Sequence, residues 1–327
     1  MKLPRFSRLA AVAATFVLGS TLLPAGPGAS SQPARTIKFV VPYSAGSPSD
    51  ILARVLGEEI GRARGLTMII EDRPGASGTI GTLAVARALP DGNTLLSVSP
   101  PLVIDPHLRK LDYDPLTSFE PICHLINLPM VIVVRDASPY RTLAELLDAA
   151  RAKPDTLTLA GVGPASSVHI AFEIIKRAAN VSMTFVPYPG PGPAISALLG
   201  EHVTSVFVPY AAVAGLLKGG KLRALATSSR TRIEALPDVP TVAESGYKDY
   251  EMDVWFGVVA PAKTPKKTVS QLADWFTAAL QVPEIKEKLA VQGLYPVGTC
   301  GADFAAYLRK KYEEYGRVIR DANIKLE

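Results

Sequence analysis

Short apolar runs alternate with segments of helical periodicity along most of the chain. The runs are four to eight residues long and rich in Val, Ile and Leu, which is typical of buried strands. The segments between them repeat apolar residues every three or four positions, and this spacing predicts helices. Nine strands are expected, over residues 37–41, 68–71, 94–98, 131–134, 157–160, 183–186, 203–208, 222–226 and 252–259.

Nine helices are expected between and after these strands. Pro90 and Pro154 end two of them, because proline cannot continue a helix. The expected ranges are 49–60, 77–89, 142–153, 167–179, 193–199, 213–217, 269–280, 283–292 and 302–322. The alternation of strands and helices favours an α/β protein with largely parallel sheets covered by helices.

The first thirty residues have the layout of a secretory signal peptide. Lys2, Arg5 and Arg8 precede an apolar stretch over 9–23, and small residues and prolines follow. The stretch is short for a membrane span, although a retained anchor helix is the alternative. We therefore expect residues 1–30 to be removed on export, at a position that the sequence does not define, and the mature protein to work outside the cytosol.

Charge and length narrow the class of protein further. The formal net charge of +5 falls to +2 once the three basic leader residues are removed. No run of Lys and Arg remains, so we expect no nucleic-acid partner. Roughly 295 mature residues exceed one ordinary core, which predicts two domains.

Two turn-rich points suggest that one domain is inserted into the other. They lie at 128–130 and 246–250, so we assign 31–129 and 248–327 to a first lobe and 130–247 to a second. Such a layout places a cleft between two sheets, beside the carboxyl ends of strands, where α/β folds bind ligands.

The turn over 42–50 is the most informative stretch for function. Ser47 fits a helix N-cap, Pro48 the first helical position, and Asp50 the acid of a capping box. Small residues at 44–46 leave backbone N–H groups open to a ligand, and a helix start attracts anions. The alternative is a well-capped turn with no ligand. Asp50 could receive a ligand amine or only cap its helix.

Three further small-residue turns precede predicted helices, at 73–78, 160–167 and 188–192. They contain no phosphate-binding P-loop and no dinucleotide fingerprint, and we expect no cofactor. No elbow or metal motif of a hydrolase occurs, and the four histidines are too scattered to form a metal site. Ser47, Ser166 and Ser167 are better explained as caps than as nucleophiles. We therefore expect no enzymatic activity.

Several side chains near these turns have two interpretations. His169 could donate to an oxyanion in the cleft, or pack and cap its helix. Arg73 could hold a carboxylate, but we favour its pairing with Asp50 or Asp72. The tyrosines at strand ends could line the cleft or pack in the lobes; they are Tyr43, Tyr188 and Tyr210.

Cys123 and Cys300 are the only cysteines, and they are isolated in the sequence. An exported protein could pair them, but nothing in the sequence brings them within reach. Buried free thiols are the expectation.

The order of several segments resembles the Bug family, the solute-binding proteins of tripartite tricarboxylate transporters. Gln292-Gly293 and residues 296–298 complete the match at the C-terminal side. The principal matching segments are 37–50 (IKFVVPYSAGSPSD), 71–81 (EDRPGASGTIG), 90–96 (PDGNTLL), 186–200 (VPYPGPGPAISALLG), 219–227 (GGKLRALAT), 236–246 (LPDVPTVAESG) and 255–261 (WFGVVAP).

The resemblance implies a periplasmic, two-lobed protein of the periplasmic binding protein-like II fold, a monomer with a ligand cleft between its lobes. It implies a small organic acid as ligand, such as a di- or tricarboxylate, an amino acid or an aromatic acid, and the membrane subunits of a transporter as partners. Backbone and hydroxyl groups of the turns would bind the acid. Carried onto this chain, these residues are Tyr43, Ser44, Gly46, Ser47, Asp50, Ser77, Gly78, Gly163, Ser166, Ser167, His169, Tyr188 and Gly190, to which we add Tyr210.

Some positions depart from the family pattern, and they bear on the ligand more than on the fold. The first loop has Ser44-Ala45-Gly46-Ser47 where the family usually has Pro-x-Pro-Gly-Gly followed by two residues and Asp, and Asn93 replaces a usual Tyr. The sequence does not name the ligand. Two alternatives in role remain, a ligand-sensing partner of a membrane receptor kinase and an exported hydrolase.

Overall fold

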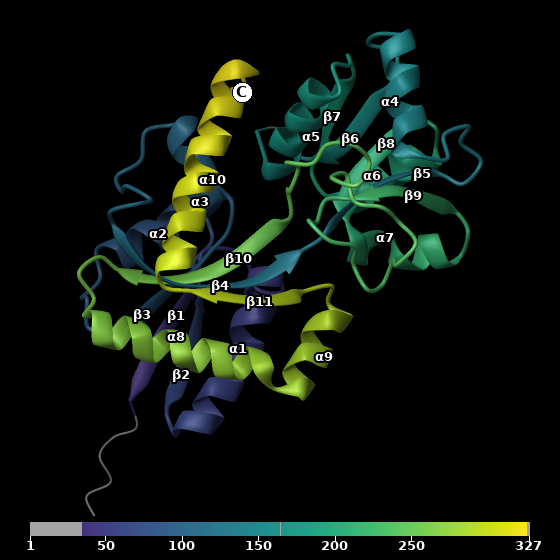
Figure 1. The fold of residues 1–327 in the computed structure, drawn as a ribbon. Coiled ribbons are helices and arrows are strands. Elements are labelled where there is room, and N and C mark those ends of the chain that lie inside the picture. The colour runs from purple at the N-terminus through teal and green to yellow at the C-terminus, as the bar shows by residue number, and fades with distance from the viewer. Residues whose placement is uncertain (1–34, 164, 326–327) are drawn as a thin grey trace, which may run out of the picture. The chain divides into compact units, whose positions relative to one another are not determined.

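The computed structural model describes residues 35–163 and 165–325, so the predicted signal peptide lies outside the described residues. The strands of the described part form two sheets, each covered by helices (Figure 1). One sheet has six strands in the order β11-β4-β10-β3-β1-β2, and the other has five in the order β7-β6-β8-β5-β9. We call the parts built on these sheets the first lobe and the second lobe.

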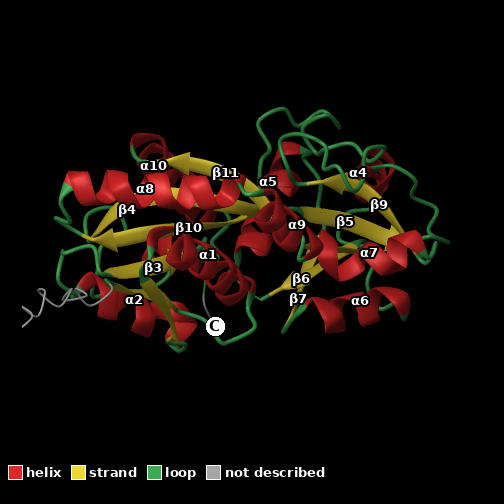
Figure 2. Cartoon of the chain, turned by 90° about the horizontal axis from the view of Figure 1, so that it is seen from below, coloured by secondary structure: helices red, strands yellow, loops and turns green. Residues whose placement is uncertain are grey.

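The six-stranded sheet of the first lobe is covered on both faces. Leu56 of α1 and Phe276 of α8 share one buried cluster, whereas Val85 of α2 and Phe304 of α10 belong to another. Figure 2, seen from below, shows α1 and α8 in front of the strands. The strands are β1 (Thr36–Val41), β2 (Thr67–Asp72), β3 (Thr94–Val98), β4 (Phe119–Leu128), β10 (Val254–Pro261) and β11 (Tyr295–Cys300); the helices are α1 (Pro48–Arg64), α2 (Thr79–Ala86), α3 (Pro101–Ile104), α8 (Lys266–Gln281), α9 (Pro283–Val291) and α10 (Ala302–Asp321), with short 3-10 turns at η1 (Ala76–Gly78) and η2 (Asp105–His107).

The five-stranded sheet of the second lobe is also enclosed by helices. Val206 and Val208 pack with the α6 and α7 side, whereas Phe207 packs with the side of α4 and α5, as expected for a strand buried on both faces. The strands are β5 (Met130–Arg135), β6 (Thr158–Val162), β7 (Thr184–Tyr188), β8 (Ser205–Pro209) and β9 (Leu222–Thr227); the helices are α4 (Leu143–Ala152), α5 (Ser167–Ala178), α6 (Pro191–Leu199) and α7 (Tyr210–Lys218).

All nine predicted strands are present, but the pattern missed β4 and β11. Pro121, His124 and Asn127 interrupt the apolar run of β4, although this strand lies between β10 and β11. The expectation of largely parallel sheets was also wrong. β10 is antiparallel to β3 and β4, and β5 is antiparallel to β8 and β9, so both sheets are mixed.

The cysteines are paired rather than free, which corrects the expectation of buried thiols. Cys123 of β4 lies directly opposite Cys300 of β11, and the two form a disulfide. The bond could not be foreseen because β11 was not predicted, and only the pairing of β11 with β4 brings residues 177 positions apart together. Their direct opposition satisfies the reach that a disulfide needs.

The chain passes between the sheets twice. The first passage is at Pro129, between β4 and β5, and the second runs from the end of β9 at Thr227 to the start of β10 at Val254. The predicted lobe limits of 31–129, 248–327 and 130–247 stay a prediction, because the described residues form one compact unit.

Candidate ligand-binding site

The turn after β1 has the predicted cap. The Ser47 hydroxyl accepts a hydrogen bond from the backbone N–H of Asp50 at 3.3 Å, and Pro48 occupies the first turn of α1. Gly46 has φ +80°, a conformation that glycine adopts without strain. The first turn of α1 is therefore held in place before any ligand arrives.

Asp50 supports this turn from within. It is only 3% exposed, its Oδ2 accepts the Gly46 N–H at 2.8 Å, and its Oδ1 lies 2.7 Å from Nε of Arg54. Burial would raise the pKa of Asp50, but the hydrogen bonds from Arg54 and Gly46 outweigh it and lower the pKa. Both oxygens are thus bound inside the protein, which favours a supporting role over contact with a ligand amine.

Tyr43 lies behind the same turn. Its hydroxyl is 2.7 Å from the Ser99 hydroxyl, and burial raises the pKa of Tyr43 to about 12. Ser77 and Asp105 join them around a cavity of about 10 Å³, room for about one water molecule. Ser99 and Asp105 were missed from the sequence, although Ser99 directly follows the predicted strand over 94–98 and a polar residue there is a recognisable signal.

The turn after β2 is strained. Four successive residues have positive φ: Gly75 at 128°, Ala76 at 47°, Ser77 at 57° and Gly78 at 91°. For residues other than glycine this conformation costs about 1–3 kcal/mol each, and such strain is concentrated at functional sites. These residues also explain why α2 begins at Thr79 and not at the predicted position 77. A Cβ at Gly78 would lie 3.3 Å from Pro42, so the two turns are in close contact.

The second lobe also has a helix, α5, whose start is capped by a serine. Ser166, not Ser167, is the N-cap of α5: its hydroxyl accepts the His169 N–H at 3.2 Å and donates to the Gly163 carbonyl at 3.0 Å. The Ser167 side chain, in the first turn, makes no hydrogen bond with any residue in the described ranges. Ser166 is therefore engaged within the fold, whereas no described residue engages the Ser167 hydroxyl.

The His169 ring packs within the second lobe, and its Nε2 makes no hydrogen bond with any described residue, so both interpretations of His169 stay open. Its Nδ1 accepts the backbone N–H of Ala165 at 3.2 Å, and its ring stacks on Phe185 with centroids 4.3 Å apart. Burial lowers the pKa of His169, which favours the neutral ring with its proton on Nε2. No serine hydroxyl reaches this Nδ1, so the second-lobe turn does not form a serine–histidine pair.

The remaining second-lobe residues adjoin this turn. The backbone N–H of Gly163 donates to the Tyr188 carbonyl at 2.9 Å, which ties the turn after β6 to the turn after β7. Gly190 is the N-cap of α6, and Tyr210 begins α7. Tyr188 and Tyr210 are half-buried.

Among the fourteen predicted residues, five hydroxyls make no hydrogen bond within the part of the chain that is described. Ser44 and Ser77 of the first lobe are exposed, whereas Ser167, Tyr188 and Tyr210 of the second are partly buried. Tyr43 and Ser77 line the small cavity of the first lobe. Tyr210 lines a different recess of about 490 Å³, together with Ala290 and Tyr295 of the first lobe, and none of the other thirteen predicted residues lines that recess.

Cationic side chains near the first-lobe turns are paired with carboxylates, and one of them, Arg109, which pairs with Asp105, also donates to the Ala76 carbonyl in the turn after β2 at 3.1 Å. Arg73 pairs with Glu71, which corrects the expected pairing with Asp50 or Asp72. Arg54, which the sequence reading did not single out, pairs with both of these aspartates. Apart from Arg109, the groups that these turns present are neutral hydroxyls and backbone donors.

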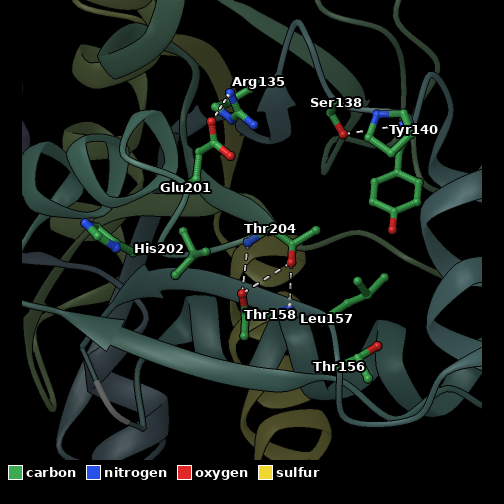
Figure 3. A pocket seen from close by; sticks show the side chains of 11 residues that line it. Arg135, Ser138, Tyr140, Thr156, Leu157, Thr158, Glu201, His202 and Thr204 are labelled. Carbon is green, nitrogen blue, oxygen red and sulfur yellow. Dashed lines mark hydrogen bonds and ion pairs between the residues drawn. The ribbon is translucent and has the colours of Figure 1, made fainter.

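The recess in Figure 3 lies elsewhere in the second lobe. It has a volume of about 390 Å³ and is lined by Arg135 at the end of β5, Thr158 at the start of β6, and Glu201, which pairs with Arg135 at 2.9 Å. None of the fourteen predicted residues lines it. The described ranges also contain no group of three or more His, Cys, Asp or Glu side chains able to hold a metal.

Known proteins match the chain along nearly its whole length. The family described as "Tripartite tricarboxylate transporter family receptor" matches residues 52–324. The chain belongs to this receptor family. Protein BugT of Bordetella pertussis is 32% identical over 324 residues, which cover 98% of this chain and 99% of BugT.

Solved structures of similar proteins share the fold of this receptor. An R. palustris protein with adipate is 30% identical, with a TM-score of 0.74 over 90% of this chain and 99% of its own. MatC from Rhodopseudomonas palustris with bound malate is 28% identical, with a TM-score of 0.68 over 88% of this chain and 100% of its own. The predicted two-lobed α/β fold of a periplasmic binding protein is thereby confirmed. None of the described helices combines the length and apolar character needed to cross a bilayer.

Proposed function

We propose that this receptor captures a small carboxylate in the periplasm and delivers it to the membrane subunits of a tripartite tricarboxylate transporter. The observation that carries the proposal is the pair of capped helix starts, one in each lobe, with unengaged hydroxyls beside them. The adipate and malate bound to the two similar proteins are small dicarboxylates, the class of ligand that such donors suit.

The fourteen predicted residues divide into two groups by their contacts. Ser44, Ser77, Ser167, Tyr188 and Tyr210 have unengaged hydroxyls, and we propose that they contact the ligand. Tyr43, Ser47, Asp50, Ser166 and His169 are engaged within the protein, and we propose that they hold the turns in place. The glycines at 46, 163 and 190 leave room for a carboxylate to approach the backbone, whereas Gly78 lets the two first-lobe turns pack together.

Neutral donors are sufficient for useful affinity. A hydrogen bond to a charged group contributes about 1.5–3 kcal/mol, and a helix start about 0.3–1 kcal/mol. Four to six such contacts, less the cost of association, reach the ~8 kcal/mol of micromolar binding. Each lobe supplies part of the site, so a bound acid would favour lobe closure.

The rest of the proposal follows from the same contacts. We propose a binding protein without enzymatic activity, because Ser166 and His169 are committed to capping and packing. We also propose that it works as a monomer after residues 1–30 are removed.

A thermal-shift screen of carboxylates, including adipate and malate, tests the proposed function. An acid that binds the folded state raises the melting temperature in a concentration-dependent way. No stabilisation by any di- or tricarboxylate, amino acid or aromatic acid would contradict the proposal.

Calorimetric titration of the best acid then tests the site. Ser167→Ala should weaken binding about tenfold or more, the loss expected for one hydrogen bond to a charged group. Ser138→Ala, in the recess of Figure 3, is the matched control and should leave the affinity unchanged. Equal affinities for the wild type and Ser167→Ala would remove Ser167 from the site.

A further inference from the structure

The second passage between the sheets contains a buried carboxyl group, that of Asp253, which has no role in the proposed capture of a ligand. Asp253 is 8% exposed and directly precedes β10. Its Oδ1 accepts hydrogen bonds from two neighbouring hydroxyls, one from Ser228 and one from Ser229 at 2.9 Å. A buried carboxylate bonded only through hydroxyl groups is unusual, because burial of a charge without a cation is costly.

Ser228 joins the two passages to each other. Its hydroxyl accepts the backbone N–H of Met130 at 2.9 Å, and its own N–H donates to the Met130 carbonyl at 2.9 Å. Its carbonyl accepts the Met252 N–H at 3.2 Å. We call Met130, Ser228, Ser229 and Asp253 the hinge clamp, because every connection of the chain between the sheets runs past these residues.

Contacts between α5 and α10 restrict how the lobes can move. The Tyr250 hydroxyl donates to the Ala171 carbonyl of α5 at 3.3 Å, and Arg177 of α5 lies 3.2 Å from Asp321 of α10. Phe172 and Tyr315 belong to one buried cluster that includes residues of both lobes. A rotation that kept these contacts would bend the chain at the hinge clamp, which lies on both passages between the sheets.

We propose that Asp253 is a positioning residue for lobe closure, whose ionised carboxylate holds Ser228 in place and so restricts the angle between the lobes. A charge-assisted hydrogen bond is roughly twice as strong as a neutral one, so the clamp should be tighter when Asp253 is ionised. The inference rests on the proposed capture of a ligand by lobe closure, but it can be tested without a ligand.

The surroundings of Asp253 allow its charge to change near neutral pH. Burial is the largest influence on it and raises the pKa of Asp253 to about 6. Lys311 does not pair with Asp253, because its Nζ is bound to the Glu251 carbonyl at 3.0 Å and to Glu314 at 3.1 Å. The other titratable groups around the cluster are Glu251 and Tyr250 on the same segment, His124 on β4, and Tyr307 and Tyr315 on α10.

Distance measurements between spin labels on the two lobes of the ligand-free protein test the proposal. Leu89→Cys in the first lobe and Leu199→Cys in the second provide exposed attachment points, at 76% and 42% exposure. In the wild type we expect a narrower distance distribution at pH 8 than at pH 5. Asp253→Asn should abolish this difference and give the broad distribution at both pH values, because asparagine remains neutral.

Two serine variants make the test specific. Ser228→Ala should give a broad distribution at both pH values, since it removes the link between the passages. Ser138→Ala is the control: within the described residues the Ser138 hydroxyl bonds to the Tyr140 N–H and to no residue of the hinge clamp, so this variant should retain the wild-type difference between pH 5 and pH 8.

The contrary outcomes are equally clear. A pH-dependent difference that persists in Asp253→Asn would assign the titration to another group, such as His124, and overturn the proposal. If Asp253→Asn fails to fold, Ser228→Ala decides, and a wild-type profile there would also overturn it. Because no acid is present, a failed carboxylate screen leaves these results unchanged.

Discussion

Asp50 and Asp253 are both buried carboxyl groups, but their surroundings have opposite effects on them. Asp50, 3% exposed, lies against Arg54 and a backbone N–H, and its pKa is lowered. Asp253, 8% exposed, is bonded to two serine hydroxyls, and burial raises its pKa to about 6. Burial alone does not decide the charge of a carboxyl group, because a neighbouring cation can reverse its effect.

The two environments suit two different tasks. In the proposed function the turn after β1 binds an anion and has to keep its shape, and the lowered pKa of Asp50 favours the ionised Asp50–Arg54 pair that holds it. A segment that bends between lobes can instead contain a group that changes its charge. Substitution of each carboxyl group, or of its cation, tests this difference.

The largest effect is expected for Asp253→Asn at pH 8. The folded-state pKa of Asp253, about 6, lies above its ordinary value of 3.8, so the wild type loses stability as the pH rises from about 4 to 6. At 1.36 kcal/mol per pKa unit the loss is at most roughly 3 kcal/mol. Urea unfolding should show the variant to be more stable than the wild type at pH 8 and similar at pH 4. Equal stabilities at pH 8 would mean that burial does not penalise this charge.

Asp50→Ala should destabilise the protein, which is the opposite of the effect expected for Asp253→Asn. It removes the acceptor of the Gly46 N–H and leaves Arg54 without one of its two carboxylates, so we expect a loss of about 2–3 kcal/mol at pH 7. Because the folded-state pKa is lowered, the stabilisation by Asp50 is present above the ordinary carboxyl pKa and disappears as the pH falls through the folded-state value. Urea unfolding at a series of acidic pH values should therefore show the two proteins converging.

Arg54→Ala isolates the role of the cation. Half of the Arg54 side chain is exposed, so water can reach the Asp50 carboxylate once Arg54 is removed. We therefore expect the free energy of unfolding to fall by a smaller amount, about 1–2 kcal/mol at pH 7. The pKa of Asp50 should rise, which nuclear magnetic resonance of the side-chain carboxyl can follow. An unchanged Asp50 pKa would show that the Gly46 N–H alone keeps it low.

The smallest effects concern the second-lobe turn, which needs no carboxylate. Ser166→Ala removes the cap of α5 and should cost about 1 kcal/mol, whereas Ser167→Ala should change the stability by less than about 0.5 kcal/mol. Thermal unfolding of both variants without ligand provides the comparison. A larger loss in Ser167→Ala would mean that it, and not Ser166, supports the helix start.

Prediction from the sequence worked where local chemistry decides the structure. The Ser47 cap, Pro48 in the first turn of α1 and the strand over 94–98 were all confirmed, because turn residues and short apolar runs act over a few positions. Prediction failed where contacts between segments distant in sequence decide the structure. β4 contains polar residues that only its neighbours β10 and β11 explain, and the partner of Arg73 depends on the sheet that places Glu71 nearby.

The alternation of strands and helices, the family and the positions of the small-residue turns can be read from the sequence. The folded structure is needed to learn which hydroxyls make no hydrogen bond within the described residues, that Cys123 and Cys300 are bonded, and that Ser228 connects Met130 to Asp253. The physical reason is that a cap or a short strand depends on interactions between residues close in sequence. A disulfide, an ion pair or a buried carboxyl group depends on residues that meet only when the whole chain has folded.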